Sequence, residues 1–358
     1  MTEITGEIWN RYGATAARHH GKPGRDLRPS STTIDIHAHI FITAAADYVA
    51  PHLDTSNVPL THFAAPESKE INKRQDADRR SRMTEYDQRL ADLDAMGIDK
   101  QLVSPAPPQC YYAVSPEIGL NAARLVNDGV ADYVSRRPDR FAALGSVPMQ
   151  DGAAAAAELE RAVKTLGFKG VQILTNVAGR ELSDPAFAPF WAKAEELGAW
   201  VFIHPSGFTE GRRMARFYFS NVIGNPLETT LALHYLIFDG VLERHPGLKI
   251  IAAHGGGFLG AYHGRIDHAW GARSDARGTL PQPPGTYLKR IYFDTIVFTP
   301  QQLQALIATF GVDHILMGTD YPFDMGEYDP IGHLAETGLT PEDMAAVAGG
   351  NARRLFDL

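Results

Sequence analysis

The segment Ile34-Asp35-Ile36-His37-Ala38-His39-Ile40 carries two histidines at alternate positions among apolar, mostly β-branched residues. Its length and its polar boundaries predict a buried strand over residues 33–40. Because side chains two positions apart on a strand point to the same face, we expect His37 and His39 to lie side by side. Two imidazoles on one face of a strand can chelate a cation, so this strand predicts part of a metal site as well as part of a sheet.

Seven further short apolar runs share these features, and they predict strands over residues 101–105, 141–148, 170–174, 200–203, 249–253, 291–294 and 314–317. Helical periodicity lies between them, over residues 82–96, 151–167, 184–197, 226–245 and 300–310, and a last helix opens at Thr340. Eight strands that alternate with helices predict a parallel sheet closed into a (β/α)₈ TIM barrel. An open doubly wound sheet is the alternative, and it is disfavoured because no glycine-rich phosphate loop follows the first strand.

The chain is expected to divide into an N-terminal extension, residues 1–31, and a barrel domain, residues 32–358. The extension is polar and contains His19 and His20, for which we expect no metal role because nothing nearby in the sequence completes a site. Weakly periodic insertions follow two strands that end in histidine, at residues 41–80 and 205–225. They are expected at the C-terminal face of the barrel, where active sites are built.

The composition is that of a globular protein. Hydrophobic residues make up 44% of the 358 residues, and charged residues 21%. The formal net charge of -8 argues against a nucleic-acid partner, which would need a basic face. No apolar run approaches the roughly 20 residues of a membrane span, and the first residues lack the apolar core of a signal peptide. Together with the single cysteine, Cys110, these features predict a cytoplasmic protein without a membrane partner.

Ligand-type side chains also stand at the ends of three other predicted strands. The fifth strand is followed by His204, the sixth by His254, and the eighth, three residues on, by Asp320. Because the C-terminal ends of parallel strands meet at one face, we expect these residues to join the histidine pair of the first strand. A lone histidine at such a position is usually a hydrogen-bonded core residue. Five such side chains at one end of four strands instead predict a site for Zn²⁺, Mn²⁺ or Fe²⁺.

Several longer motifs resemble those of the amidohydrolase superfamily, and within it the decarboxylase branch. They are DIHAH (35–39), GSVPMQ (145–150), LGFKGVQI (166–173), NPLETT (225–230), GVLERHPGLKI (240–250), AHGGG (253–257) and GTDYPFDMGE (318–327). The likeness runs from Ile34 to the C-terminus and implies a TIM barrel with one divalent cation, Zn²⁺ or alternatively Mn²⁺. A second cation would need a carboxylated lysine at the end of the fourth strand, and Lys169 lies at its opposite end. Family members have His-Pro-Trp where this chain has His204-Pro205-Ser206, which predicts a different pocket wall.

The resemblance also implies roles for the residues at the strand ends. His37, His39, His204 and Asp320 would hold the cation, and His254 would be the catalytic acid/base beside a metal-bound water, with Asp320 also catalytic. The implied reaction is nonoxidative decarboxylation of a small anionic substrate, an aromatic or muconate-type carboxylic acid. The alternative is a metal-dependent hydrolase or hydratase that acts on an ester, a lactone or a C–C bond at the same site. A third interpretation, a metal-stabilised binding protein, is disfavoured because His254 completes the catalytic set.

Arginines are expected to bind the substrate carboxylate, because their planar fork matches its geometry. The resemblance aligns Arg80 with one such residue, and Arg79 and Arg82 are alternatives within the stretch RQDADRRSR. It aligns Arg273 with an arginine that a partner subunit contributes, which implies a homodimer or a higher homo-oligomer. Asp294, at the end of the seventh strand, is expected to contact either the substrate or the protein's own hydrogen-bond donors.

Overall fold

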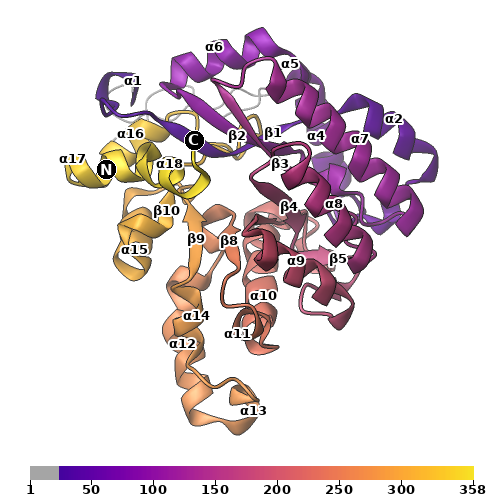
Figure 1. Cartoon of the computed structure of the whole chain (residues 1–358), viewed down its shortest axis with the longest axis vertical. Helices are drawn as coiled ribbons and strands as arrows, with labels where there is room; N and C mark the ends of the chain where they lie inside the picture. The colour runs from indigo at the N-terminus through magenta and orange to yellow at the C-terminus, as the bar shows by residue number, and fades with distance from the viewer. Residues whose placement is uncertain (1–23) are drawn as a thin grey trace.

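Eight parallel strands curve into a barrel in the computed structural model, which describes residues 24–358 (Figure 1). In sheet order they are β1 (Ile34–Ile40), β2 (Lys100–Pro105), β3 (Phe141–Gly145), β4 (Gly170–Leu174), β7 (Trp200–His204), β8 (Lys249–Ala252), β9 (Ile291–Asp294) and β10 (Ile315–Leu316). The chain after β10 returns to β1, where the amide of Ile36 donates to the carbonyl of Met317 at 3.0 Å and that of His39 to Tyr321 at 2.8 Å. The predicted (β/α)₈ barrel is therefore confirmed.

Helices surround this sheet (Figure 1). The longer ones are α4 (Pro66–Asp78), α6 (Tyr86–Met96), α7 (Pro116–Ser135), α8 (Gly152–Lys164), α9 (Ala188–Leu197), α10 (Asn225–Phe238), α12 (Leu259–Ala272) and α15 (Pro300–Phe310). The sequence prediction missed α7 and α12. Helix α7 has a clear start, since the Ser115 side chain caps it by accepting from the amide of Ile118 at 3.4 Å. Helix α12 buries only Leu259, so its sequence offers no apolar stripe to detect.

Shorter helices complete the shell. They are α1 (Gly24–Leu27), α2 (Thr43–Val49), α3 (Pro59–His62), α5 (Arg80–Thr84), α11 (Val241–Arg244), α13 (Ser274–Arg277), α14 (Pro284–Leu288), α16 (Pro330–Ala335), α17 (Pro341–Ala345) and α18 (Asn351–Phe356). Two predicted helices are broken: extended Glu85 separates α5 from α6, and Gly240, with φ 73°, lies between α10 and α11. The 41–80 insertion is largely helical, and the loop after β4 forms a small antiparallel pair, β5 (Asn176–Val177) with β6 (Arg180–Glu181).

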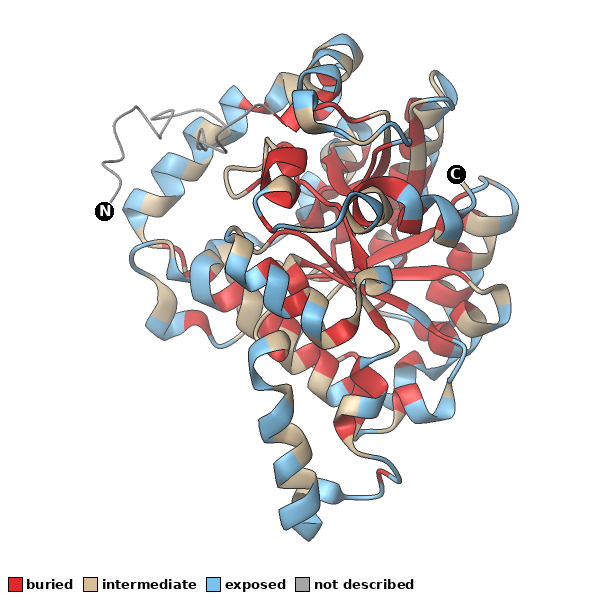
Figure 2. Ribbon diagram, turned by 90° about the vertical axis from the view of Figure 1, so that its left-hand side faces the viewer, coloured by how far each residue is buried: buried red, intermediate tan, exposed pale blue. Residues whose placement is uncertain are grey.

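The C-terminal helix α18 closes the barrel at the N-terminal end of its strands. Trp200 in β7 donates its indole N–H to the carbonyl of Leu355 at 3.2 Å and packs on Phe356, with ring centroids 4.9 Å apart. The strands are buried almost throughout (Figure 2), and all seven residues of β1 are buried. The opposite end of the barrel, where the strands terminate, is therefore left for the site.

The predicted N-terminal extension is described only in part. Residues 1–23, with His19 and His20, lie outside the described residues, so the expectation for these histidines stays a prediction. From residue 24 the chain packs on the barrel domain, since the amide of Gly24 in α1 donates to Asp329 Oδ1 at 2.9 Å. The division into extension and barrel domain also stays a prediction.

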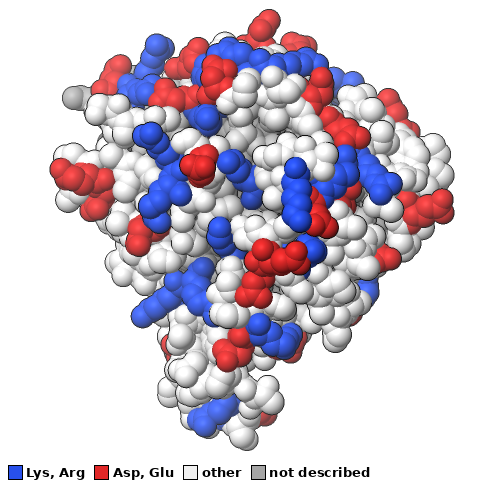
Figure 3. Space-filling view, viewed as in Figure 1, with Lys and Arg blue, Asp and Glu red and all other residues white. Residues whose placement is uncertain are grey.

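Acidic and basic side chains are interspersed on the face of the molecule shown in Figure 3. Among the helices of residues 24–358, none combines the length and the apolar character that crossing a membrane requires. The cytoplasmic location expected from the sequence stays a prediction.

Candidate metal centre

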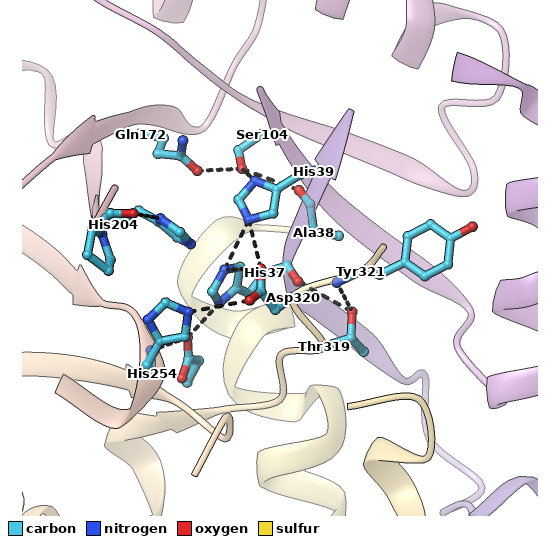
Figure 4. A network of polar contacts seen from close by, with 12 residues as sticks. His37, Ala38, His39, Ser104, Gln172, His204, His254, Thr319, Asp320 and Tyr321 are labelled. Carbon is cyan, nitrogen blue, oxygen red and sulfur yellow. Dashed lines mark hydrogen bonds and ion pairs between the residues drawn. The ribbon is translucent and has the colours of Figure 1, made fainter. Parts of the chain in front are cut away.

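Four side chains converge where the strands end (Figure 4). His37 and His39 come from β1, His204 ends β7, and Asp320 lies just after β10. All four are buried, and each offers a ligand atom within 4.8 Å of the others. The structure thus brings together the four residues expected from the sequence, and residues 24–358 contain no second cluster of this kind.

Protein acceptors fix the orientation of the three imidazole rings. Each Nδ1 has one: Asp294 Oδ2 at 2.6 Å for His37, the carbonyl of Pro105 at 3.2 Å for His39, and the carbonyl of Pro205 at 2.7 Å for His204. With Nδ1 committed to the protein, Nε2 is the nitrogen left for a ligand on each ring. His204 Nε2 is buried without a hydrogen-bond partner, and the Nε2 atoms of His37 and His39 lie 3.1 Å apart. This arrangement fits a cation at the focus of the three rings.

Burial and charge give three of the four residues the protonation state that a metal ligand needs. Burial lowers the pKa of His39 to about 4 and keeps that of His204 well below its usual range, so both rings are neutral ligands at neutral pH. Burial raises the pKa of Asp320, but the charge of His37 and hydrogen bonds from the neighbouring histidines bring it well below its usual range. Burial likewise opposes protonation of His37, yet Asp320 and Asp294 raise its pKa to about 10. Because a metal ligand must be deprotonated, His37 would lose a proton when a cation binds.

Asp294, the last residue of β9, supports the cluster from behind. Its Oδ2 accepts from His37 Nδ1 and from the amide of His254 at 2.9 Å, and its Oδ1 accepts two further amides, one of them from Gly255 at 2.9 Å. The residue has no exposed surface. These contacts match the hydrogen-bonding alternative for Asp294 and leave no free face for a substrate. Gly318 allows its backbone to pack closely against His37, since a Cβ at residue 318 would lie 2.9 Å from His37 Cβ.

His254 lies beside the four-residue cluster, at the start of the turn η7 (His254–Gly256) that follows β8. Its Nε2 is 3.4 Å from Asp320 Oδ2, and its side chain is 15% exposed, against 7% for Asp320. Both residues have positive φ, 55° and 57°, a conformation that is uncommon outside glycine and concentrates at functional sites. The glycines that follow allow the turn to pack closely: a Cβ at Gly257 would lie 2.2 Å from the carbonyl oxygen of Pro226.

A family model described as amidohydrolase matches residues 34–358. The chain belongs to the amidohydrolase family. The 2-amino-3-carboxymuconate-6-semialdehyde decarboxylase of Dictyostelium discoideum is 37% identical over 275 residues, which cover 76% of each chain. The 5-carboxyvanillate decarboxylase of Sphingomonas paucimobilis superposes with a TM-score of 0.81 at 26% identity, over 92% of this chain and 100% of that one. A dihydroxybenzoic acid decarboxylase from a Polaromonas species, solved with manganese and the inhibitor 2-nitroresorcinol, gives 0.76 at 25% identity, over 92% and 97%. The resemblance inferred from the motifs is confirmed.

In this amidohydrolase, Arg79 is the buried member of the three candidate arginines. It lies between α4 and α5, its side chain is 8% exposed, and its guanidinium lies 4.9 Å from the ring centroid of Phe323. The Phe323 ring in turn lies 5.1 Å from that of His39. Arg80, the residue aligned from the sequence, is exposed, and Arg82 is held in a separate ion pair. The structure therefore places the neighbouring arginine close to the metal ligands.

One nitrogen of the Arg79 guanidinium makes no hydrogen bond within the protein. Nε and Nη2 donate to Asp76 Oδ1, whereas Nη1 is buried without a hydrogen-bond partner and lies 3.7 Å from Asp324 Oδ1. The hydroxyl of Tyr218 donates to the same Asp324 oxygen at 3.5 Å. Burial raises the pKa of Asp324 and, well above its usual range, that of Tyr218. A buried guanidinium nitrogen without a partner is suited to an incoming anionic oxygen.

Arg273 is far from the metal centre of its own chain. It lies at the junction of α12 and α13, which project from the barrel as an arm (Figures 1 and 2). Its side chain is 68% exposed and pairs with Asp275 at 2.7 Å. One chain alone therefore does not bring Arg273 to the site.

His39 is supported by residues that the sequence reasoning missed. Ser104 Oγ lies 3.1 Å from His39 Nδ1 and donates to Gln172 Oε1 at 2.7 Å. Arg89, fully buried, donates to the carbonyl of His39 at 2.5 Å. Ser104 and Gln172 had a signal, because each is a polar residue inside a predicted buried strand, where a polar group needs a partner.

Proposed function

We propose that this amidohydrolase removes CO₂ nonoxidatively from a small aromatic or muconate-type carboxylic acid. The observation that carries the proposal is the convergence of three imidazoles and Asp320 on one focus, with His254 beside it. The relatives support the reaction class, since those described above are decarboxylases of aromatic or muconate-type acids. Arg79, near the same focus, supports an anionic substrate.

One divalent cation is the proposed cofactor, held by His37, His39, His204 and Asp320. Imidazole nitrogens and a carboxylate suit both Zn²⁺, the cation first expected, and Mn²⁺, which the Polaromonas relative holds. A second cation would require a lysine at the C-terminal end of β4, whereas Lys169 precedes β4 and donates to the carbonyl of Asp357 at 3.2 Å. When bound, the cation would supply positive charge that polarises an oxygen of the substrate.

Arg79 is the proposed anchor for the anionic end of the substrate. Its Nη1, which has no hydrogen-bond partner, can donate to a carboxylate or phenolate oxygen. Because the Phe323 ring lies between Arg79 and His39, that oxygen would lie near the metal ligands. A guanidinium binds such an oxygen through short, charge-assisted hydrogen bonds. The anchor therefore fixes the orientation of the carboxylate relative to the metal ligands.

His254 is the proposed proton donor. In the reaction the bond between the substrate carbon and its carboxylate breaks, CO₂ leaves, and the same carbon gains one proton, so no oxidant or reductant is consumed. An imidazole can hold and transfer a proton near neutral pH, and His254 is more exposed than the residues of the cluster. Asp320, whose Oδ2 lies 3.4 Å from His254 Nε2, orients the ring, and solvent then restores the proton.

A homodimer is proposed, in which Arg273 reaches the site of the partner. The projecting arm supports it, as do exposed apolar side chains, among them Phe217 at 68% and Tyr262 at 57%.

Two inactive variants, Arg273→Ala and His254→Gln, test the sharing of sites. When the two variants are refolded together, about half of the dimers are mixed, and each mixed dimer has one intact site of two. The mixture should therefore recover roughly a quarter of the wild-type activity. A failure to recover activity, or an active monomer in sedimentation, would contradict the shared site.

The reaction class is tested by incubation in D₂O with 2-hydroxybenzoates, 2-aminobenzoates and muconates. We expect one CO₂ per product molecule and one deuterium on the carbon that lost the carboxylate, seen by NMR. The His254→Gln variant is the control and should form both roughly 10²- to 10⁴-fold more slowly. Products that have gained water without release of CO₂ would instead support a hydrolase or hydratase.

A further inference from the structure

A hollow of about 330 Å³ lies at the C-terminal end of the barrel, next to the metal centre. We call it the Tyr112 pocket; it is lined by the end of β4, the loops after β2, β4 and β7, and part of the first insertion, residues 53–61. Neither the metal-binding residues nor His254 lines it. It nevertheless shares a wall with the site, since Leu174 pairs with His204 across β4 and β7, and Ser206 follows His204 by two residues.

The lining of the Tyr112 pocket is mostly apolar and carries no positive charge. Apolar and aromatic side chains form much of it, among them Leu53, Val58, Pro108, Tyr111, Tyr112 and Leu174. Its lining residues, all of them described, include no lysine, arginine or histidine, and Glu210 supplies their one carboxyl group. Behind this wall, buried Glu228 accepts from the amide of Thr209 at 3.1 Å. A carboxylate in this pocket would thus meet the carboxyl group of Glu210 and no cation.

Small residues keep the pocket open on the side of His204. Gly207 has φ 81°, and a Cβ there would lie 2.5 Å from the backbone nitrogen of Leu60, so this position requires glycine. Ser206, half-buried, presents only a hydroxymethyl group to the pocket. A larger side chain at residue 206 would fill part of the volume.

We propose that the Tyr112 pocket receives a bulky, uncharged substituent of the substrate, remote from the reacting carboxylate; this inference rests on the decarboxylase function proposed above. Its volume is within the roughly 300–1,000 Å³ range of small-molecule sites. Positive charge for the carboxylate is available at the cation and at Arg79, whereas the pocket offers mainly apolar contact and no positive charge. The enzyme therefore selects monocarboxylic acids with an alkyl, alkoxy or second aromatic group over the matching dicarboxylic acids.

The test compares three 2-hydroxybenzoates that differ at one ring position, which carries hydrogen, an uncharged alkoxy group or a second carboxylate. For the wild-type enzyme we expect kcat/KM to be highest for the alkoxy acid and lowest for the diacid. In Ser206→Trp the ratio of kcat/KM for the alkoxy acid to that for the unsubstituted acid should fall by about 10- to 200-fold. Ser206→Ala is the matched control and should keep the wild-type ratio.

Binding of the corresponding phenols, the products that lack the carboxylate, gives a readout that needs no turnover. Calorimetry should show that Ser206→Trp weakens binding of the alkoxyphenol far more than that of phenol, with melting temperatures confirming that the variant is folded. A wild-type preference for the diacid, or equal ratios in both Ser206 variants, would overturn the assignment of the pocket. Absence of CO₂ from all three acids with the binding pattern intact would instead refute only the decarboxylase function.

Discussion

His37 donates its Nδ1 proton to Asp294 Oδ2 across 2.6 Å, between two side chains that have no exposed surface. The same oxygen accepts the amide of His254, so one carboxylate positions both a metal-binding residue and the proposed proton donor. Second-layer hydrogen bonds of this kind fix the ring orientation of a ligand and raise its basicity.

Replacing this carboxylate should weaken metal binding without removing a ligand. We expect Asp294→Asn to lower metal affinity by roughly 10- to 100-fold, because the amide cannot act as a charged acceptor for His37 Nδ1. Competition with a chelator measures the change. Asp275→Asn, at an exposed carboxylate on the arm, is the control. An unchanged affinity in Asp294→Asn would show that the contact does not tune the site.

Removing the proposed proton donor should separate catalysis from metal content. In His254→Gln we expect kcat for CO₂ release to fall by roughly 10²- to 10⁴-fold, the usual contribution of general acid–base catalysis. Metal content by elemental analysis should stay at the wild-type value, since His254 lies outside the ligand set. His52→Gln, at an exposed histidine, should behave as wild type. Full activity in His254→Gln would assign proton transfer to another group.

The two adjacent arginines form a matched pair for testing the substrate anchor. We expect Arg79→Lys to raise KM for the acid about 10- to 100-fold, because lysine keeps the charge but loses the fork and the contact with Phe323. Arg80→Lys, at the exposed neighbour, should leave KM unchanged. Steady-state kinetics measures both KM values. A raised KM in Arg80→Lys with an unchanged KM in Arg79→Lys would identify Arg80 as the anchor.

Glu228 should make stability depend on pH. Burial raises its pKa from 4.5 to about 7, opposed by hydrogen bonds from Thr209 and helped by the nearby carboxylate of Glu181. The folded protein therefore holds this proton more tightly than the unfolded chain. The resulting stabilisation is complete below pH 4.5 and is lost as the pH rises through 7, by roughly 3 kcal/mol.

The variant Glu228→Gln keeps an acceptor for Thr209 and removes the titration. Denaturant unfolding at pH 5.5 and pH 8 should show that its stability changes less over this interval than that of the wild type. Glu85→Gln, at an exposed position, should keep the wild-type pH dependence. Identical pH profiles for wild type and Glu228→Gln would contradict the raised pKa.

Strand periodicity and strand ends made most of the barrel predictable. The strands at 170–174 and 291–294 have the predicted bounds, and the alternation of His37 and His39 led directly to half of the metal centre. Parallel strands bring residues far apart in the sequence to one rim, so His204 and Asp320 could be added without an alignment.

The anchor and the pocket depend on features that periodicity does not contain. In RQDADRRSR the residue types are alike, and only the break between α4 and α5 turns Arg79 inward and Arg80 outward. The Tyr112 pocket is formed by loops from separate parts of the chain, and its charge follows from which side chains meet there. Helix α12 stays hidden because it buries little.

The most direct test of the central claim measures metal content and CO₂ release on the same preparation during metal titration of the chelated protein. The account predicts that CO₂ release from the preferred acid is absent without metal, rises in proportion to added Zn²⁺ or Mn²⁺, and reaches its plateau at one ion per chain. His39→Ala should bind metal weakly and fail to reach this plateau. Full CO₂ release from metal-free protein, or a plateau at two ions per chain, would contradict the single-cation site.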